Sequence, residues 1–252
     1  MRNALKVLFV VALAIPTMAS ALIANTKHNL TSSGPGTVKF TDPAADACKF
    51  CHLVHDANAA NGTLWARQAP TGPAFTTPNA TANGTPLDAT MAILGAGSTK
   101  CLSCHDGTVA LNVVVNNASV TQIVAASNTA VGNVVAGGGG MVLRGSTYLS
   151  SLNGPHPVGL PFAGQTGSSA VNAEYGTASV AGCQPGVPVC VAGATTPTAG
   201  AYIKLFGAAG AYQVECSSCH EPHQDNLAGN NPYFLRVPGT ITNGRCGACH
   251  KK

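Results

Sequence analysis

Four copies of the motif Cys-x-x-Cys-His carry most of the chemistry that this chain can perform. The cysteines are Cys48, Cys51, Cys101, Cys104, Cys216, Cys219, Cys246 and Cys249, and the histidines that follow them are His52, His105, His220 and His250. On one helical turn, residues i, i+3 and i+4 share a face, so two thiols and an imidazole can point at one flat ring. This pattern is the attachment signature of a c-type haem, with the cysteines bound to the porphyrin and the histidine bound to the iron.

A single copy of the motif has two other interpretations, a zinc half-site and a redox-active cysteine pair. A zinc ribbon does not need a histidine directly after the second cysteine, yet that histidine follows all four copies. The sequence therefore predicts four covalently bound haems c, with the eight cysteines as attachment residues and the four motif histidines as proximal iron ligands.

Outside the motifs the chain has only four more histidines, which are His28, His55, His156 and His223. They equal in number the four remaining axial positions, and neutral imidazole is a good iron ligand. Methionine is the weaker option, because the exported chain contains only Met91 and Met141. We therefore predict two histidine ligands at every iron. Since no iron then has an open position for a substrate, we expect an electron carrier and not an enzyme.

Short chain links restrict which iron each of these histidines can reach. His55 follows His52 by three residues and lies on the same side of the first haem, so it must bind a different haem. The same argument excludes His223 from the haem of His220. Such cross-ligation holds haems close together. His28 lies twenty residues before the first haem cysteine, so its arm can fold back onto its own chain or reach a neighbouring subunit.

The order of these residues repeats along the chain. His28 precedes a CxxCHxxH motif and then a plain CxxCH motif, and His156 precedes the same two motifs in the second half. This order predicts the duplication of a two-haem unit. We expect one tetrahaem domain, residues 22–252. In it, residues 22–110 would bind the first haem pair, residues from about 110 to 200 would be an insertion, and residues from about 200 to 252 would bind the second haem pair.

Residues 1–21 are predicted to be a secretory signal peptide. Two positive charges precede an apolar run of nine residues, Val7–Ile15, and Ala19-Ser20-Ala21 is a small-x-small cleavage site. The run is too short to span a bilayer, and no other stretch of the chain is long and apolar enough to do so. We expect an exported protein that begins at Leu22 and has no membrane span after cleavage, in agreement with haem c attachment outside the cytoplasm.

The composition restricts the fold class. Charged residues make up 9% of the chain and aromatic residues 5%, so few large side chains are available for an ordinary core. Four haems would supply large apolar surfaces, with ligation adding to the folding free energy. We predict a multihaem cytochrome c fold: mostly irregular structure wrapped around four haems, with short helices at the CxxCH motifs. A few short strands are also expected, among them residues 108–115 and 202–206.

The two cysteines outside the motifs, Cys183 and Cys190, bracket a Pro-Gly turn signal. In an oxidising compartment they are expected to form a disulfide, a local link with no redox role. Removal of the signal peptide leaves 11 basic and 9 acidic residues, and haem propionates would move this balance towards negative values. The chain has no basic stripe, so nucleic acid is not an expected partner.

Several segments around the motifs carry a family resemblance. They are His28-Asn29-Leu30 with Gly34-Pro35-Gly36, the first motif with His55, Leu64-Trp65, the second motif with Asp106-Gly107-Thr108, the third motif with Glu221-Pro222-His223, residues 232–236 and the closing fourth motif. Over most of the exported chain, except roughly residues 110–200, these segments resemble the doubled-CxxCH multihaem cytochromes. The resemblance implies an outer-surface cytochrome like those of metal-reducing bacteria. Some tetrahaem and hexahaem relatives polymerise into conductive extracellular filaments, in which an N-terminal histidine of one subunit completes a haem of the next.

Three functions compete at this point. The first is a tetrahaem electron conduit at the cell surface or in an extracellular filament, which its low charge and many small residues favour. The second is a soluble periplasmic shuttle, a class that usually presents charged docking surfaces. The third is a reductase, which would need one iron with an open position. The expected partners are redox proteins, extracellular electron acceptors and, for a filament, further copies of the chain.

Overall fold

The structure, a computed structural model, describes residues 22–40, 46–59, 62, 64–68, 70, 81–82, 85–86, 94–116, 119–122, 130–131, 134–137, 140–143, 149, 152, 158–162, 177–179, 190–192, 203–208, 211–223, 233–236 and 250. The predicted signal peptide, His156, Cys183, Cys246 and Cys249 lie outside these residues. Of the fourth motif, His250 is described.

The helices are short, and three of them contain motif residues. They are η1 (Leu22–Asn25), η2 (Ala47–Phe50), α1 (Ala96–His105) and α2 (Cys216–Cys219). Each of the last three begins at a defined capping residue. The carboxylate of Asp46 accepts a hydrogen bond from the backbone N–H of Cys48 at 2.8 Å, and Glu215 forms a capping box with Ser218. The longest of these helices, α1, holds the whole second motif in its last turn and a half.

The strands pair only in twos within the described part of the chain, as six antiparallel two-stranded sheets. Four are hairpins: β2 (Thr81–Ala82) with β3 (Thr85–Pro86), β4 (Val113–Asn116) with β5 (Ser119–Gln122), β7 (Val134–Gly137) with β8 (Gly140–Leu143), and β10 (Thr177–Ser179) with β11 (Cys190–Ala192). Two join distant segments: β1 (Lys39–Phe40) with β6 (Ala130–Val131), and β9 (Leu160–Pro161) with β12 (Gln213–Val214).

The two expected strands differ from the observed structure. In the range 108–115, β4 begins at Val113, because residues 106–112 turn after α1. There Asp106 accepts hydrogen bonds from the N–H of Thr108 at 2.9 Å and from its hydroxyl, which favours a turn over an extended strand. In the range 202–206, the chain forms isolated bridges, such as that between Phe206 and Gln213.

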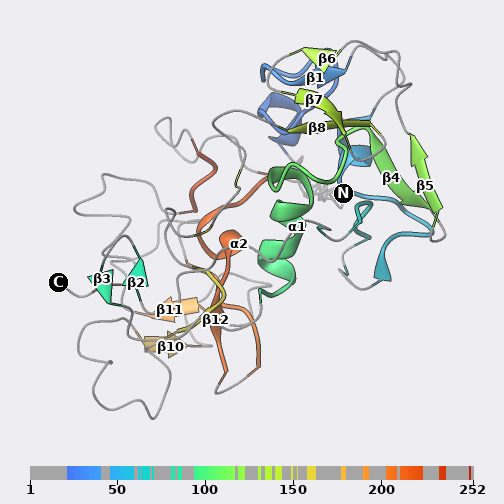
Figure 1. Cartoon of the computed structure of the whole chain (residues 1–252). Helices are drawn as coiled ribbons and strands as arrows, with labels where there is room; N and C mark the ends of the chain where they lie inside the picture. Colours follow the sequence, from blue (N-terminus) through green and yellow to red (C-terminus); the bar gives the residue numbers. More distant parts are fainter. Residues whose placement is uncertain are drawn as a thin grey trace, which may run out of the picture.

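Helices α1 and α2 lie side by side near the middle of the molecule (Figure 1). Ser98 links them, since its hydroxyl donates to the Glu215 carboxylate and accepts from the N–H of Cys216 at 3.0 Å. Gly97 allows this approach, because a Cβ there would lie 2.6 Å from the hydroxyl oxygen of Ser217 and 2.9 Å from Cβ of Glu215. The packing brings the second and third motifs into contact.

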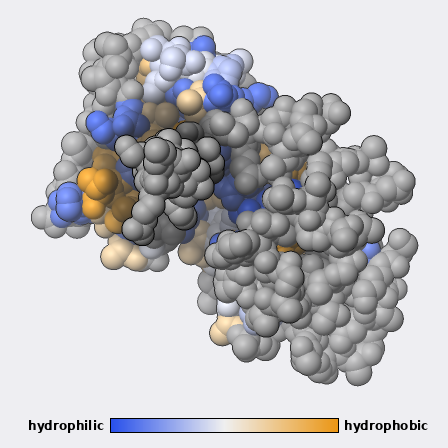
Figure 2. Space-filling view, turned by 180° about the vertical axis from the view of Figure 1, so that it is seen from behind, coloured by the Kyte–Doolittle hydropathy of each residue, from blue (hydrophilic) through white to orange (hydrophobic). Residues whose placement is uncertain are grey.

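The apolar core around the motifs is small. Phe40, Phe50 and Leu111 form one buried cluster, in which the two phenyl rings stack with centres 5.7 Å apart. Cys51 and Cys104, from the first and second motifs, pack against this cluster. Hydrophobic and hydrophilic residues both reach the described surface (Figure 2). Among the described helices, none is long and apolar enough to cross a membrane.

Candidate haem-binding site

The first motif forms a closed loop with the segment that follows it. We define the first motif loop as residues 48–55 and 64–67. His52 pairs with Trp65 in an antiparallel bridge, the N–H of Leu53 donates to the carbonyl of Leu64 at 2.9 Å, and the N–H of Ala66 donates to the carbonyl of Cys51 at 2.8 Å. Leu64 has a φ of 54°, the left-handed conformation in which the chain turns back to the motif.

The third motif has the same arrangement. We define the third motif loop as residues 216–223 and 233–236. His220 pairs with Leu235. The N–H of Glu221 donates to the carbonyl of Phe234 at 2.7 Å, and the N–H of Arg236 donates to the carbonyl of Cys219 at 2.7 Å. Phe234, at the position of Leu64, has a φ of 57°. Two segments more than 160 residues apart thus share one backbone pattern, which agrees with an internal duplication.

Each loop also contains an arginine whose Nε donates to a motif carbonyl. Nε of Arg67 donates to the carbonyl of Phe50 at 2.6 Å, and Nε of Arg236 donates to the carbonyl of Ser217 at 3.0 Å. Both arginines are buried. These contacts close the motif backbone over its two cysteines.

The thiols of different motifs lie beside one another. The Cys101 thiol hydrogen-bonds with the Cys216 thiol; this bond and burial raise the pKa of Cys101, whereas the same bond lowers the pKa of Cys216 to about 7. Burial raises the pKa of Cys51 to about 12, with a further contribution from the Cys104 thiol nearby. Burial also raises the pKa of Cys48. Redox-active cysteine pairs have a lowered thiol pKa, so the first motif does not have the environment of such a pair.

Among the described residues, histidines that are distant in sequence come together in two pairs. The ring centres of His52 and His223 lie 6.0 Å apart with their planes at 17°. The ring centres of His28 and His105 lie 6.2 Å apart with their planes at 74°. Each pair joins a motif histidine to one of the four histidines outside the motifs.

Two of the histidines on the third motif loop are oriented through Nδ1. The Nδ1 atom of His220 lies 2.7 Å from the carbonyl oxygen of Tyr233, and that of His223 lies 2.9 Å from a carboxylate oxygen of Glu221. Metal-binding histidines usually donate their second ring N–H to a carbonyl or a carboxylate in this way, which leaves the other nitrogen for the metal. His220 and His223 therefore have the surroundings of iron ligands that bind through Nε2.

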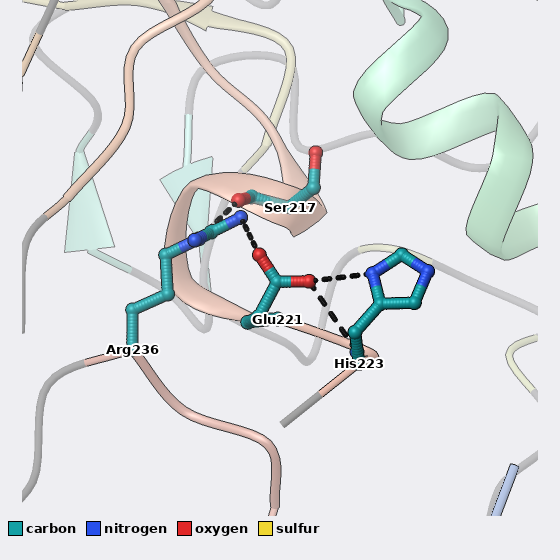
Figure 3. A network of polar contacts seen from close by, with 4 residues as sticks. All are labelled: Ser217, Glu221, His223 and Arg236. Carbon is teal, nitrogen blue, oxygen red and sulfur yellow. Dashed lines mark hydrogen bonds and ion pairs between the residues drawn. The ribbon is translucent and has the colours of Figure 1, made fainter. Parts of the chain in front are cut away.

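Figure 3 shows how Glu221 links His223 to the rest of the loop. One carboxylate oxygen faces the imidazole, and the other forms an ion pair with Arg236 at 2.7 Å. Partial burial raises the pKa of Glu221, but the hydrogen bonds from His223 and the charge of Arg236 outweigh it and lower this pKa to about 2. The hydrogen bond to Glu221 in turn raises the pKa of His223.

His28 lies on a compact turn and not on an extended arm. Its N–H donates to the hydroxyl of Thr26 at 3.1 Å, and the side chain of Asn29 donates to the carbonyl of Ala24 at 2.8 Å. Gly34 closes the turn, because a Cβ there would lie 1.8 Å from the carbonyl oxygen of Asn29. The ring of His28 then stacks on that of Phe234 at 4.4 Å, with the planes at 15°.

The His28 ring is half-buried and has a buried nitrogen that makes no hydrogen bond. Burial, and after it the charge of His105, lowers the pKa of His28 to about 4, so the ring is neutral, as a metal ligand must be. Its Nδ1 atom is buried and has no hydrogen-bond partner. A buried polar nitrogen without a partner is rare and calls for a specific explanation.

The described residues fit a haem c better than a zinc ion. No group of three or more His, Cys, Asp or Glu side chains in the described part of the chain lies close enough together to hold a metal ion, whereas structural zinc needs about four protein ligands. A haem iron needs only two, because the porphyrin supplies the others. Histidine pairs near the motif cysteines are such a set.

The predicted ligands are placed unequally. His28, His52, His105, His220 and His223 lie around the junction of the motifs, whereas His55 is exposed and no contact places it near a motif histidine in the described structure. Among the residues that shape the site, Glu221, Arg67 and Arg236 were assigned no site role by the sequence, although Glu221 and Arg236 lie in segments that carry the family resemblance. The position of Glu221 between His220 and His223 was the available signal, since a carboxylate there can reach either imidazole.

No protein-family model and no curated protein matches this chain. The assignment of its function therefore rests on the motifs and on the geometry around them.

Proposed function

We propose that the protein is a tetrahaem c-type cytochrome, which carries electrons through four closely packed haems with two histidine ligands each. The observation that carries the proposal is the convergence of three motifs. Thiols of the second motif, on α1, lie beside thiols of both the first and the third. Because a porphyrin is joined to its motif through these sulfur atoms, neighbouring thiols support neighbouring porphyrin edges.

Haem, when bound, supplies a one-electron ferric/ferrous couple whose potential depends on axial ligands, nearby charge and burial. The residues of the chain hold it in place and set those conditions. The cysteines anchor the porphyrin edge, and the buried cluster of Phe40, Phe50 and Leu111 keeps the surroundings of the first two motifs apolar. The eight histidines equal the eight axial positions. This balance supports an electron carrier over a reductase, which would need an open iron.

We place the protein outside the cytoplasm, at the cell surface or as a filament subunit, in preference to a periplasmic shuttle. The signal-like N-terminus and the low charge support this placement. The large hydrophobic side chains exposed on the described surface are Val54, Leu64 and Tyr233, at 78%, 52% and 62%, and all three belong to the two motif loops. Apolar groups beside the motifs suit contact with another protein or another copy better than a charged docking surface would.

The first test is a haem count on the exported protein. We expect four haems per chain that survive denaturation and acidic organic extraction, a wholly low-spin ferric spectrum and little carbon monoxide binding after reduction. The control is Cys246→Ala with Cys249→Ala, which should remove one haem and leave three. A purified native protein that contains zinc in place of haem would overturn the proposal, and a high-spin fraction would favour the reductase.

The second test separates the conduit from the shuttle. Electron microscopy and size-exclusion chromatography of the exported fraction should show filaments or large assemblies of the haem-loaded protein. A uniformly monomeric protein confined to the periplasm would favour the shuttle.

A further inference from the structure

We propose that His28 and His105 are the two axial ligands of the second haem, and that His52 and His223 are those of the first. The inference rests on the proposed function, because it assigns ligands to haems that the proposal requires. With this assignment, the ligands of the first haem come from both halves of the chain, whereas both ligands of the second haem come from the first half.

The ring distances carry the assignment. Two imidazoles that bind one metal ion from opposite sides have ring centres about 6 Å apart, since each metal–nitrogen bond is about 2 Å long and each ring centre lies about 1 Å beyond its nitrogen. The observed separations are 6.0 Å for His52 with His223 and 6.2 Å for His28 with His105. The stack of His28 on Phe234 is closer, with ring centres 4.4 Å apart.

The hydrogen bonds of His223 support the first pair. Its Nδ1 is held by Glu221 at 2.9 Å, so Nε2 is the nitrogen that remains for iron. His223 cannot serve the haem of His220, which is three residues away in the chain. A pair with His52 removes that difficulty, because His52 belongs to another motif.

The surroundings of His28 support the second pair and place both ligands in one chain. The ring is half-buried, Phe234 stacks on it, and its buried Nδ1 atom has no hydrogen-bond partner. His105 of the same chain lies at the distance that a shared iron requires. An arm that reached another subunit would leave the turn of residues 26–34 and lose the stacking on Phe234. We therefore assign His28 to the second haem of its own chain.

Deletion of single haems tests the pairing. His28→Ala should make one haem high-spin and reactive with carbon monoxide in the four-haem protein, and His223→Ala should do the same. With Cys101→Ala and Cys104→Ala, which remove the second haem, His28→Ala should add no high-spin signal, whereas His223→Ala still should. With Cys48→Ala and Cys51→Ala, which remove the first haem, the two results should be exchanged. A high-spin signal from His28→Ala in protein without the second haem would overturn the pairing.

A second set of variants covers the case in which a haem-deleted protein does not fold. Methionine keeps an iron six-coordinate and raises its potential relative to histidine. His28→Met with His105→Met should shift one haem in a redox titration, whereas His28→Met with His52→Met should shift two. Two shifted haems in the first combination would overturn the assignment of His28.

The outcomes also separate this inference from the proposed function. If the unmodified protein has four covalent, low-spin haems but the histidine variants alter haems other than the first and second as assigned, the pairing alone would be rejected. Absence of covalent haem from the unmodified protein would reject both. An unchanged spectrum in His28→Ala would show that His28 is no ligand. If a high-spin haem in that variant became low-spin on mixing with a copy that retains His28 but lacks its own second haem, the ligand would come from another subunit.

Discussion

The first and third motif loops share a backbone but use their charged side chains differently. In the third loop Arg236 forms an ion pair with Glu221, which in turn holds His223. In the first loop the position of Glu221 is taken by Leu53, which cannot orient His55. Arg67 binds carbonyls instead, those of Phe50, Ala110, Leu111 and Val113.

The difference shows how two loops can keep one backbone pattern while their side chains take different roles. The backbone hydrogen bonds between each motif and its return segment join main-chain atoms, so they tolerate most side chains. The arginine near the end of each loop was free to take a separate role. Arg67 ties the first loop to the turn after α1, and Arg236 fixes the orientation of a candidate iron ligand.

The largest expected effect is the loss of Arg67. Arg67→Met should lower the free energy of unfolding by about 3 kcal/mol or more, because it leaves four carbonyl groups without their buried donor. Arg236→Met is the matched control and should cost about 1–3 kcal/mol, since it frees one carbonyl and one partly exposed carboxylate. Denaturant titrations of the haem-loaded proteins, followed by haem absorbance, measure both. Equal losses would contradict the different roles of the two arginines.

A smaller effect is expected at the contact between α1 and the third motif loop. Gly97→Ala should cost about 1–3 kcal/mol, because the added methyl group meets Ser217 and Glu215. The hydroxyl of Ser217 is buried without a partner, so Ser217→Ala alone should be nearly neutral. The double variant should recover part of the loss in thermal denaturation. If Gly97→Ala were neutral, the two helices would not pack as closely as described.

The smallest effect on stability, and a specific effect on potential, is expected for Glu221→Gln. The amide can still accept a hydrogen bond from His223 but carries no charge, so the imidazole becomes a weaker donor to iron. One haem should then titrate at a higher potential while all four stay low-spin. The converse variant, Leu53→Glu, should lower the potential of one haem if it gives His55 the partner that His223 has. Unchanged potentials in Glu221→Gln would show that its role is structural only.

Much of the candidate site could be predicted from residue types and spacing. The motif cysteines, the proximal histidines and the repeated order are local patterns, and i, i+3, i+4 spacing decides which side chains share a face. The three-residue link also predicts that His55 and His223, if they are haem ligands, serve haems of other motifs. The strands at residues 108–115 and 202–206 were less predictable, because an Asp106 turn and isolated bridges replaced extended structure where β-propensity alone favoured it.

What the sequence by itself determined is the inventory: four CxxCH motifs, eight histidines and a repeated order. Only the tertiary structure decided which histidines meet. His28 and His105 are 77 residues apart in the chain, and His52 and His223 are 171 apart, so no local rule relates them. Their meeting depends on Gly97, which lets α1 approach α2, and on Phe234, which stacks on His28. Such contacts join segments that are distant in sequence, and their geometry depends on the packing of the whole chain.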